Sequence, residues 1–113
     1  MNLDETMRKI EKEFAAAAQA QRVGNDGMVR VCARRAAGAA IGFWLRSHPH
    51  PEWGVDAMTQ LRNLQIDDST VETVRHAAER LTTKITEQFK APFATDPLAD
   101  ARLIITHLTG QTI

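Results

Sequence analysis

The sequence has a single cysteine, no apolar run approaching the roughly 20 residues of a membrane span, and no net charge. Cys32 alone excludes a disulfide within the chain and, without a secretory signal, favours a reducing cytoplasm. Fourteen basic residues balance fourteen acidic ones, so any contact with nucleic acid or an anionic membrane requires a local patch. We therefore expect a cytoplasmic globular protein that does not associate with membranes.

Several motifs of enzymes and metal sites are also missing. There is no CxxC pair, no glycine-rich phosphate-binding loop and no Ser-His-Asp order. His48 and His50 offer two imidazoles, but no third ligand stands at a recognisable spacing, so a proline-bound loop is the better interpretation. Trp44 and Trp53 bracket this loop and are expected to pack together. We expect neither a metal nor a cofactor.

What the sequence does contain is apolar residues at helical spacing, in a chain of 113 residues that is long enough for one domain with its own core. The apolar stripes predict helices over residues 2–22, 26–46, 53–64, 69–91 and 97–109. No segment alternates between apolar and polar residues as a strand does. The expected fold is therefore all-α, a four- to five-helix up-and-down bundle that forms a single domain over residues 1–113.

Helix-boundary signals support these predictions. Gly24 and Asn25 suit the end of the first helix, and the prolines at 49 and 51 stop the second. The third helix is expected to bury a stripe of Val55, Met58, Leu61 and Leu64. Ser69 and Glu72 fit a capping box that opens the fourth helix, whose inward residues are Val71, Val74, Ala78, Leu81, Ile85 and Phe89. Asp96 and Pro97 start the last helix, and Gly110 closes it.

The second predicted helix, which contains RVCARRAAGAAIGFWL over residues 30–45, is apolar on every side. A helix of this kind is normally central in a bundle. Gly38 and Gly42, with the alanines between them, favour close approach of a neighbouring helix, either in the same chain or in another copy. Arg34 is unusual here because it shares a face with Ile41 and Leu45.

A guanidinium in such a setting is costly unless a carboxylate meets it. We therefore expect Arg34 to pair with a carboxylate, with Asp56 or Asp100 as candidates, or to extend to the surface. The alternative is functional, with Arg30 and Arg34 adding positive charge to a phosphate- or RNA-binding site.

In the last helix, Arg102 and His107 flank an outward arc that has Leu103 at its centre. An apolar residue there suggests that a partner subunit covers the arc. A histidine that titrates near neutrality can transfer protons, and an arginine can hold a phosphate by two hydrogen bonds. Arg102 and His107 are therefore the candidate catalytic residues, suited to metal-independent cleavage of RNA. The alternative is an exposed pair without a function, because an arginine and a histidine at this spacing often occur in helices by chance.

The late motif Arg102-Leu103-Ile104-Ile105-Thr106-His107, in an all-helical chain of this length, resembles the HEPN superfamily (higher eukaryotes and prokaryotes nucleotide-binding). The stretch RVCARRAAG over residues 30–38 is similar to one in small bacterial proteins of that group. The resemblance implies a homodimer in which two R-x4-6-H motifs face each other and cut RNA without metal. Arg102 would then bind the scissile phosphate, and His107 would be the general acid or base.

Active members of the superfamily usually place a polar residue directly after the arginine, whereas this chain has Leu103. The favoured interpretation is therefore a dimeric interaction or regulatory module that binds RNA or a nucleotide, without robust catalysis. A metal-independent ribonuclease is one alternative, and a helical protein with purely structural arginines is another. The resemblance also implies a nucleotidyltransferase partner protein, as in toxin–antitoxin pairs.

Overall fold

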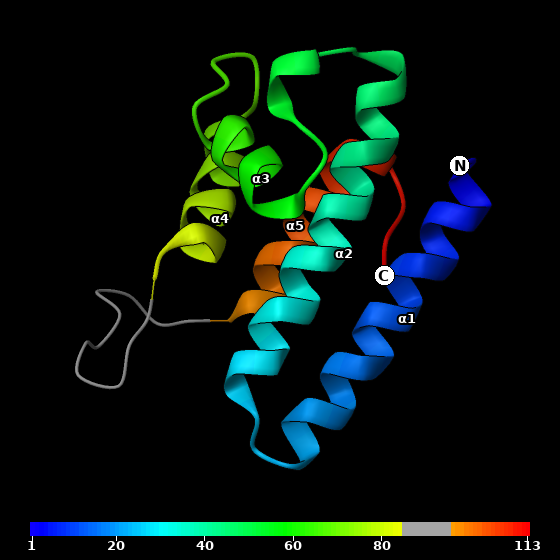
Figure 1. Cartoon of the computed structure of the whole chain (residues 1–113), viewed down its shortest axis with the longest axis vertical. Coiled ribbons are helices and arrows are strands. Elements are labelled where there is room, and N and C mark those ends of the chain that lie inside the picture. Colours follow the sequence, from blue (N-terminus) through cyan, green and yellow to red (C-terminus); the bar gives the residue numbers. More distant parts are fainter. Residues whose placement is uncertain (85–95) are drawn as a thin grey trace.

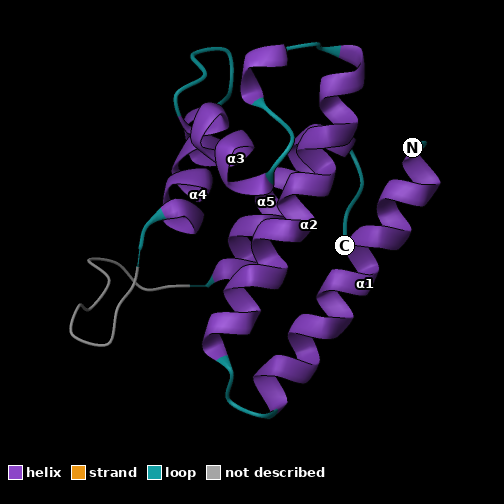
Figure 2. Ribbon diagram, viewed as in Figure 1, coloured by secondary structure: helices purple, strands orange, loops and turns teal. Residues whose placement is uncertain are grey.

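The chain folds into five α-helices and one short 3-10 turn, and no strand occurs in residues 1–84 and 96–113, which the computed structural model describes (Figures 1 and 2). The elements are α1 (Leu3–Arg22), α2 (Asp26–Ser47), η1 (Pro51–Trp53), α3 (Ala57–Gln65), α4 (Glu72–Thr82) and α5 (Pro97–Thr109). This confirms the expected all-α bundle. None of these helices combines the length and apolar character that crossing a membrane requires.

Short polar side chains begin three of the helices, close to where the sequence places their starts. The side chains of Asn2, Asn25 and Asp96 accept hydrogen bonds from backbone amides in the first turns of α1, α2 and α5. Gly110 ends α5 in the left-handed conformation, at a φ of 73°. These helices form where they do because local capping satisfies their terminal backbone groups.

Helix α2 is the central element of the bundle and contacts all four other helices. In Figure 1, α1 and α4 run in one direction while α2 and α5 run in the other. Four alanines of α2 are fully buried: Ala33, Ala36, Ala37 and Ala40. Small side chains on several sides of one helix let its neighbours approach closely, which confirms the central position that the sequence predicts.

Gly38 of α2 lies directly against Ala57 at the start of α3. A Cβ atom added there would lie 2.7 Å from the Cβ of Ala57 and 3.2 Å from its Cα. Gly42 has no such neighbour, since an added Cβ would meet nothing within 4 Å among the described residues. The expected packing role is therefore confirmed for Gly38, whereas no described residue of the same chain packs against Gly42.

The third helix begins later than the sequence predicts. Residues 51–53 form the 3-10 turn, and Gly54 follows at a φ of 74°. Asp56 then caps α3 by accepting a hydrogen bond of 3.0 Å from the amide of Thr59. Val55 consequently lies in the connection and is 97% exposed, so its place in the buried stripe is wrong.

The predicted capping box of the fourth helix is also wrong. The N-cap is Val71, which provides no side-chain hydrogen bond. The hydroxyls of Ser69 and Thr70 instead donate to one carboxylate oxygen of Asp67, at 2.7 and 2.6 Å. Burial by itself raises the pKa of Asp67, but hydrogen bonds from Thr70 and Ser69 outweigh it and lower that pKa overall. Ser69 is therefore bound to Asp67 and does not cap the helix.

Helix α4 ends at Thr82, earlier than predicted, and Thr83 is extended. The hydroxyls of Thr82 and Thr83 donate back to the carbonyls of Ala78 and Glu79, at 3.0 and 2.8 Å. Such local bonds compete with continuation of the helix. The expected inward positions at Ile85 and Phe89 and the stop before Pro92 lie outside the described residues.

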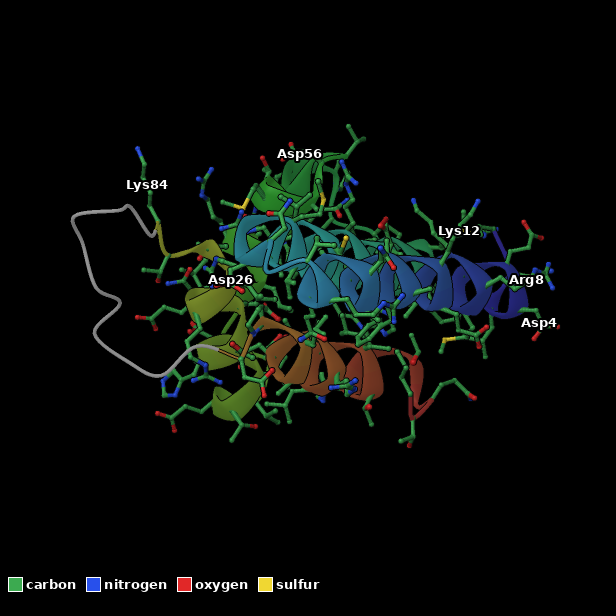
Figure 3. The ribbon with its side chains drawn as sticks, turned by 90° about the horizontal axis from the view of Figure 1, so that it is seen from below. Asp4, Arg8, Lys12, Asp26, Asp56 and Lys84 are labelled. Carbon is green, nitrogen blue, oxygen red and sulfur yellow. The ribbon has the colours of Figure 1, made fainter. Side chains whose placement is uncertain are left out.

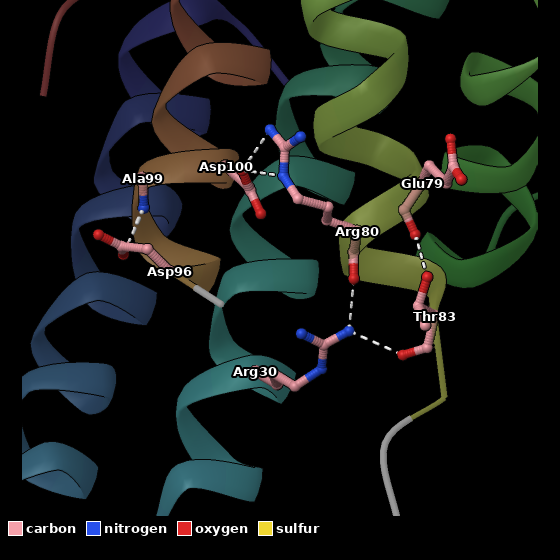
Figure 4. Close-up of polar contacts among 7 residues, drawn as sticks. All are labelled: Arg30, Glu79, Arg80, Thr83, Asp96, Ala99 and Asp100. Atoms are coloured by element: carbon pink, nitrogen blue, oxygen red, sulfur yellow. Dashed lines mark hydrogen bonds and ion pairs between the residues drawn. The ribbon is translucent and has the colours of Figure 1, made fainter. Parts of the chain in front are cut away.

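A partly buried ion pair joins α4 to α5 (Figure 4). The Nε and Nη2 atoms of Arg80 donate to Oδ1 of Asp100 at 3.0 and 2.8 Å. Only 8% of the Asp100 side chain is exposed, against 31% of the Arg80 side chain. Removing the carboxylate would leave a partly buried cation without its partner.

We expect Gly38→Ala and Gly42→Ala to have opposite effects on stability. The methyl at position 38 overlaps Ala57 and should lower the free energy of unfolding by about 1 to 3 kcal/mol. At position 42 the methyl meets no described atom, and the better helix propensity of alanine should raise that free energy by about 0.5 to 1 kcal/mol. Urea unfolding of both variants tests this, and equal effects would contradict the close approach of α2 and α3.

Asp100→Ala is expected to lower the free energy of unfolding by about 3 kcal/mol, because Arg80 loses its partner. The double variant Arg80→Met/Asp100→Ala should be more stable than Asp100→Ala, since no unpaired cation is left. Urea unfolding of the single and double variants gives the coupling energy. Additive losses would show that the pair is not coupled.

Candidate functional site

Helix α5 presents the predicted R-x4-H arc to solvent. Arg102, Leu103, Thr106 and His107 are all exposed, with Leu103 at 46%. Arg102 and His107 line one groove between α4 and α5, of about 610 Å³. Its other lining residues are mostly apolar or small: Val71, Thr73, Val74, Ala99, Leu103 and Thr106. The arc is therefore an accessible surface with an apolar centre.

The two candidate catalytic side chains are held differently. The guanidinium of Arg102 lies over the ring of Phe14 on α1, 5.0 Å from its centroid. This cation–π contact anchors the arginine to the first helix. His107 makes no hydrogen bond to a described residue, so no protein group there fixes its tautomer or orientation. A general acid or base usually needs such a partner. The single chain thus offers an accessible Arg–His pair in which only the arginine is anchored.

Arg30 and Arg34 extend from α2 to the C-terminal end of α4, and Figure 4 shows the contacts of Arg30. Nη2 of Arg30 donates to the carbonyl oxygens of Arg80, Leu81 and Thr83, at 2.6, 3.2 and 2.8 Å. Nε of Arg34 donates to the carbonyl oxygen of Leu81 at 2.7 Å. The final carbonyls of a helix have no partner within it, and they carry partial negative charge. The two arginines thus cap α4 from another helix.

The expected pairing of Arg34 with Asp56 or Asp100 is wrong. Asp100 accepts from Arg80, and Asp56 caps α3. The partner of Arg34 is a backbone carbonyl, because the early end of α4 leaves carbonyls that need donors within its reach. A side-chain pattern in the sequence does not reveal this, since every residue carries a carbonyl.

The pKa values of Arg30 and Arg34 are lowered by burial and by repulsion from neighbouring cations. Burial lowers the pKa of Arg30, the charge of Arg34 lowers it further, and Asp100 acts in the opposite direction. Burial also lowers the pKa of Arg34, followed by the charge of Arg62. Arginine nevertheless stays protonated in proteins. The fold therefore holds like charges close together.

The predicted site residues belong to two separate places. Arg102 and His107 lie in the groove beside Val71 and Val74, at the start of α4, whereas Arg30 and Arg34 lie at its end. The 11 residues of α4 separate these places by about 16 Å, at 1.5 Å per residue. A single site that combines all four residues does not form within one chain.

Two cations near Arg30 and Arg34 were not predicted from the sequence. Arg62 of α3 and Lys84, just after α4, line a pocket of about 350 Å³ together with Arg30 and Arg34. Arg62 lies on the outer face of a short amphipathic helix, where a charged residue carries no specific signal. Only the packing of α3 against α2 and α4 brings it to this place.

The histidines near the proline loop pack on tryptophan. The Trp44 ring is stacked with His48 and His50 at centroid distances of 4.5 and 5.8 Å, and lies 5.5 Å from Trp53. This confirms the expected contact between the two tryptophans. Within residues 1–84 and 96–113, no group of three or more histidine, cysteine or acidic side chains is placed to hold a metal ion.

Comparison of the chain with protein-family models, curated proteins and solved structures finds no match.

We expect Arg30→Met to lower the free energy of unfolding by about 2 kcal/mol, because three carbonyls lose a charged donor. Arg35→Met is the matched control, since Arg35 is exposed on the same helix and makes no hydrogen bond to the described residues. It should change stability by less than about 0.5 kcal/mol. Urea unfolding distinguishes them, and equal losses would show that the carbonyl contacts add nothing.

Proposed function

We propose that this chain is a homodimeric, HEPN-type interaction module that binds RNA or a partner protein through its α4–α5 face, without robust catalysis. The observation that carries the proposal is the half-exposed, apolar centre of the groove, where Leu103 is 46% and Val71 50% exposed. Large apolar side chains gathered on one surface are a common mark of an interaction site.

A second copy of the chain suits this surface. Ala99 and Thr106 lie on the same arc as Leu103, one turn before and just under one turn after it, and both have small side chains. Two α5 helices related by a two-fold axis can each place Leu103 between the small residues of the other. Both Arg102–His107 pairs would then lie along one seam, as the resemblance to the superfamily implies.

Binding is favoured over catalysis by the side chains themselves. No described residue orients His107, and Phe14 holds the Arg102 guanidinium against α1. Active members of the resembled superfamily usually have a polar residue directly after the arginine, where this chain has Leu103. Arg102 and His107 therefore serve the module as cationic and polar contacts beside an apolar anchor.

Leu103→Glu is expected to split the dimer, because it places two carboxylates at the symmetry axis. Light scattering should give twice the 12.6 kDa chain mass for the unchanged protein and the single chain mass for the variant. Val55→Glu is the matched control, since Val55 is 97% exposed and lies outside this groove. It should remain dimeric. A monomeric unchanged protein would rule out the paired arc and favour a helical protein with structural arginines.

Incubation with single-stranded RNA in the presence of a chelator tests the ribonuclease alternative. We expect no cleavage by the unchanged protein beyond that of His107→Ala. Cleavage that His107→Ala reduces about 100-fold or more would instead establish a metal-independent ribonuclease with His107 as acid or base. The fold of the variant is checked by its thermal unfolding, because His107 is exposed and its loss should leave stability unchanged.

A further inference from the structure

A pocket with four positive side chains lies at the end of α4, away from the α4–α5 groove. Arg30 and Arg34 of α2, Arg62 of α3 and Lys84 line its volume of about 350 Å³. Its other lining residues are uncharged, and no carboxylate of the described chain is among them. We refer to these four residues and their cavity as the basic pocket. In a chain with no net charge, such a local concentration of one sign calls for an explanation.

The carboxylates around the basic pocket form no ion pair with its four cations among the described residues. Asp26 and Asp96 line a neighbouring pocket with Arg30, and Asp96 accepts the hydrogen bond that caps α5. The charge of Asp100 raises the pKa of Arg30, but its Oδ1 accepts two hydrogen bonds from Arg80. Asp56 accepts the hydrogen bond of the α3 cap from Thr59. This bond lowers the pKa of Asp56, and the charge of Arg62 lowers it further. No acidic side chain of the described residues therefore forms an ion pair with the four cations or lines their pocket.

The two arginines of α2 are fixed in place but keep unused donors. Arg30 binds the α4 carbonyls through Nη2 alone, and Arg34 through Nε alone. A guanidinium has five N–H groups, so Nε and Nη1 of Arg30 and both Nη atoms of Arg34 have no hydrogen-bond partner among the described residues. Donors that are already oriented lose little entropy when a ligand binds.

The end of α4 reduces the positive potential only in part. A helix C-terminus carries about half a negative charge, against four full positive charges around the cavity. The pKa of Arg34 is lowered first by burial and then by the charge of Arg62, so these two cations repel each other. A bound anion would relieve this repulsion and would gain hydrogen bonds assisted by charge.

We propose that the basic pocket binds the diphosphate or triphosphate group of a small ligand. Four cations exceed the charge of a single phosphate, and they converge on one concavity rather than along a stripe that could follow an RNA backbone. The volume of about 350 Å³ is near the lower end of small-molecule pockets, which span about 300 to 1,000 Å³. This site goes beyond the interaction face of α4 and α5 and does not depend on it.

Isothermal titration with inorganic pyrophosphate at low ionic strength tests the proposal. We expect the unchanged chain to bind, and Arg62→Gln and Lys84→Gln each to weaken binding about tenfold. Both side chains are exposed and make no hydrogen bond to described residues, so thermal unfolding should be unchanged in both variants. The matched control is Lys12→Gln, which removes the same charge at the opposite end of the bundle from Lys84 (Figure 3). It should change binding less than about twofold.

A parallel titration with a nucleoside diphosphate shows whether the phosphate group that binds belongs to a nucleotide or to an inorganic polyphosphate. If the nucleoside diphosphate binds as tightly as pyrophosphate or more tightly, the ligand is a nucleotide. If only pyrophosphate binds, the ligand is an inorganic polyphosphate. Absence of binding to both, or an equal loss in Lys12→Gln and Arg62→Gln, would overturn the proposal. So would tighter binding of a short single-stranded RNA that Arg62→Gln abolishes. Leu103→Glu should retain pyrophosphate binding, so that failure of the dimer proposal and failure of this one are distinguishable.

Discussion

The carbonyl groups in the last turn of α4 need hydrogen-bond donors, and α2 supplies them through Arg30 and Arg34. This contact joins the central helix to the helix with which it otherwise shares few contacts, across about 50 residues of sequence. It also explains how a helix as rich in alanine as α2 accommodates charge. The guanidiniums leave the apolar environment by capping another helix, and each lines a cavity while keeping unbonded donors.

Helix α4 has a different role at each of its ends. Its first residues form one side of the apolar groove with α5, while its last carbonyls anchor two arginines of the basic pocket. The Arg80–Asp100 pair holds α4 against α5 between these surfaces. Two surfaces of different chemistry, one apolar and one cationic, thus lie at opposite ends of one helix.

Much of the fold could be predicted from local sequence, and the exceptions are instructive. The caps at Asn25, Asp96 and Gly110 act within one turn, so α2 and α5 begin and end close to where the sequence places them. Ser69 fits a capping box by spacing, but Asp67 competes for its hydroxyl. Helix α3 begins later than the predicted residue 53 because Gly54 adopts a positive φ and Asp56 caps the helix after it.

The candidate sites were less predictable because they depend on contacts between distant residues. The exposed arc of Arg102 and His107 follows from helical spacing, but the position of Arg102 over Phe14 does not. The sequence indicates that Arg30 and Arg34 are unusual, but the predicted carboxylate partner of Arg34 is wrong. Its partner is a backbone carbonyl, and because every residue has one, the sequence does not indicate which carbonyl is used. Arg62 joins them only through the packing of α3.

The exchange rate of the Arg34 Nε proton, measured by NMR, tests the capping of α4 by α2 most directly. Because Nε donates to the Leu81 carbonyl at 2.7 Å, its proton should exchange with water much more slowly than that of the exposed Arg62. Arg34 and Arg62 are compared within one sample, so solvent conditions are identical for both. Equal exchange rates would show that Arg34 does not hold the end of α4.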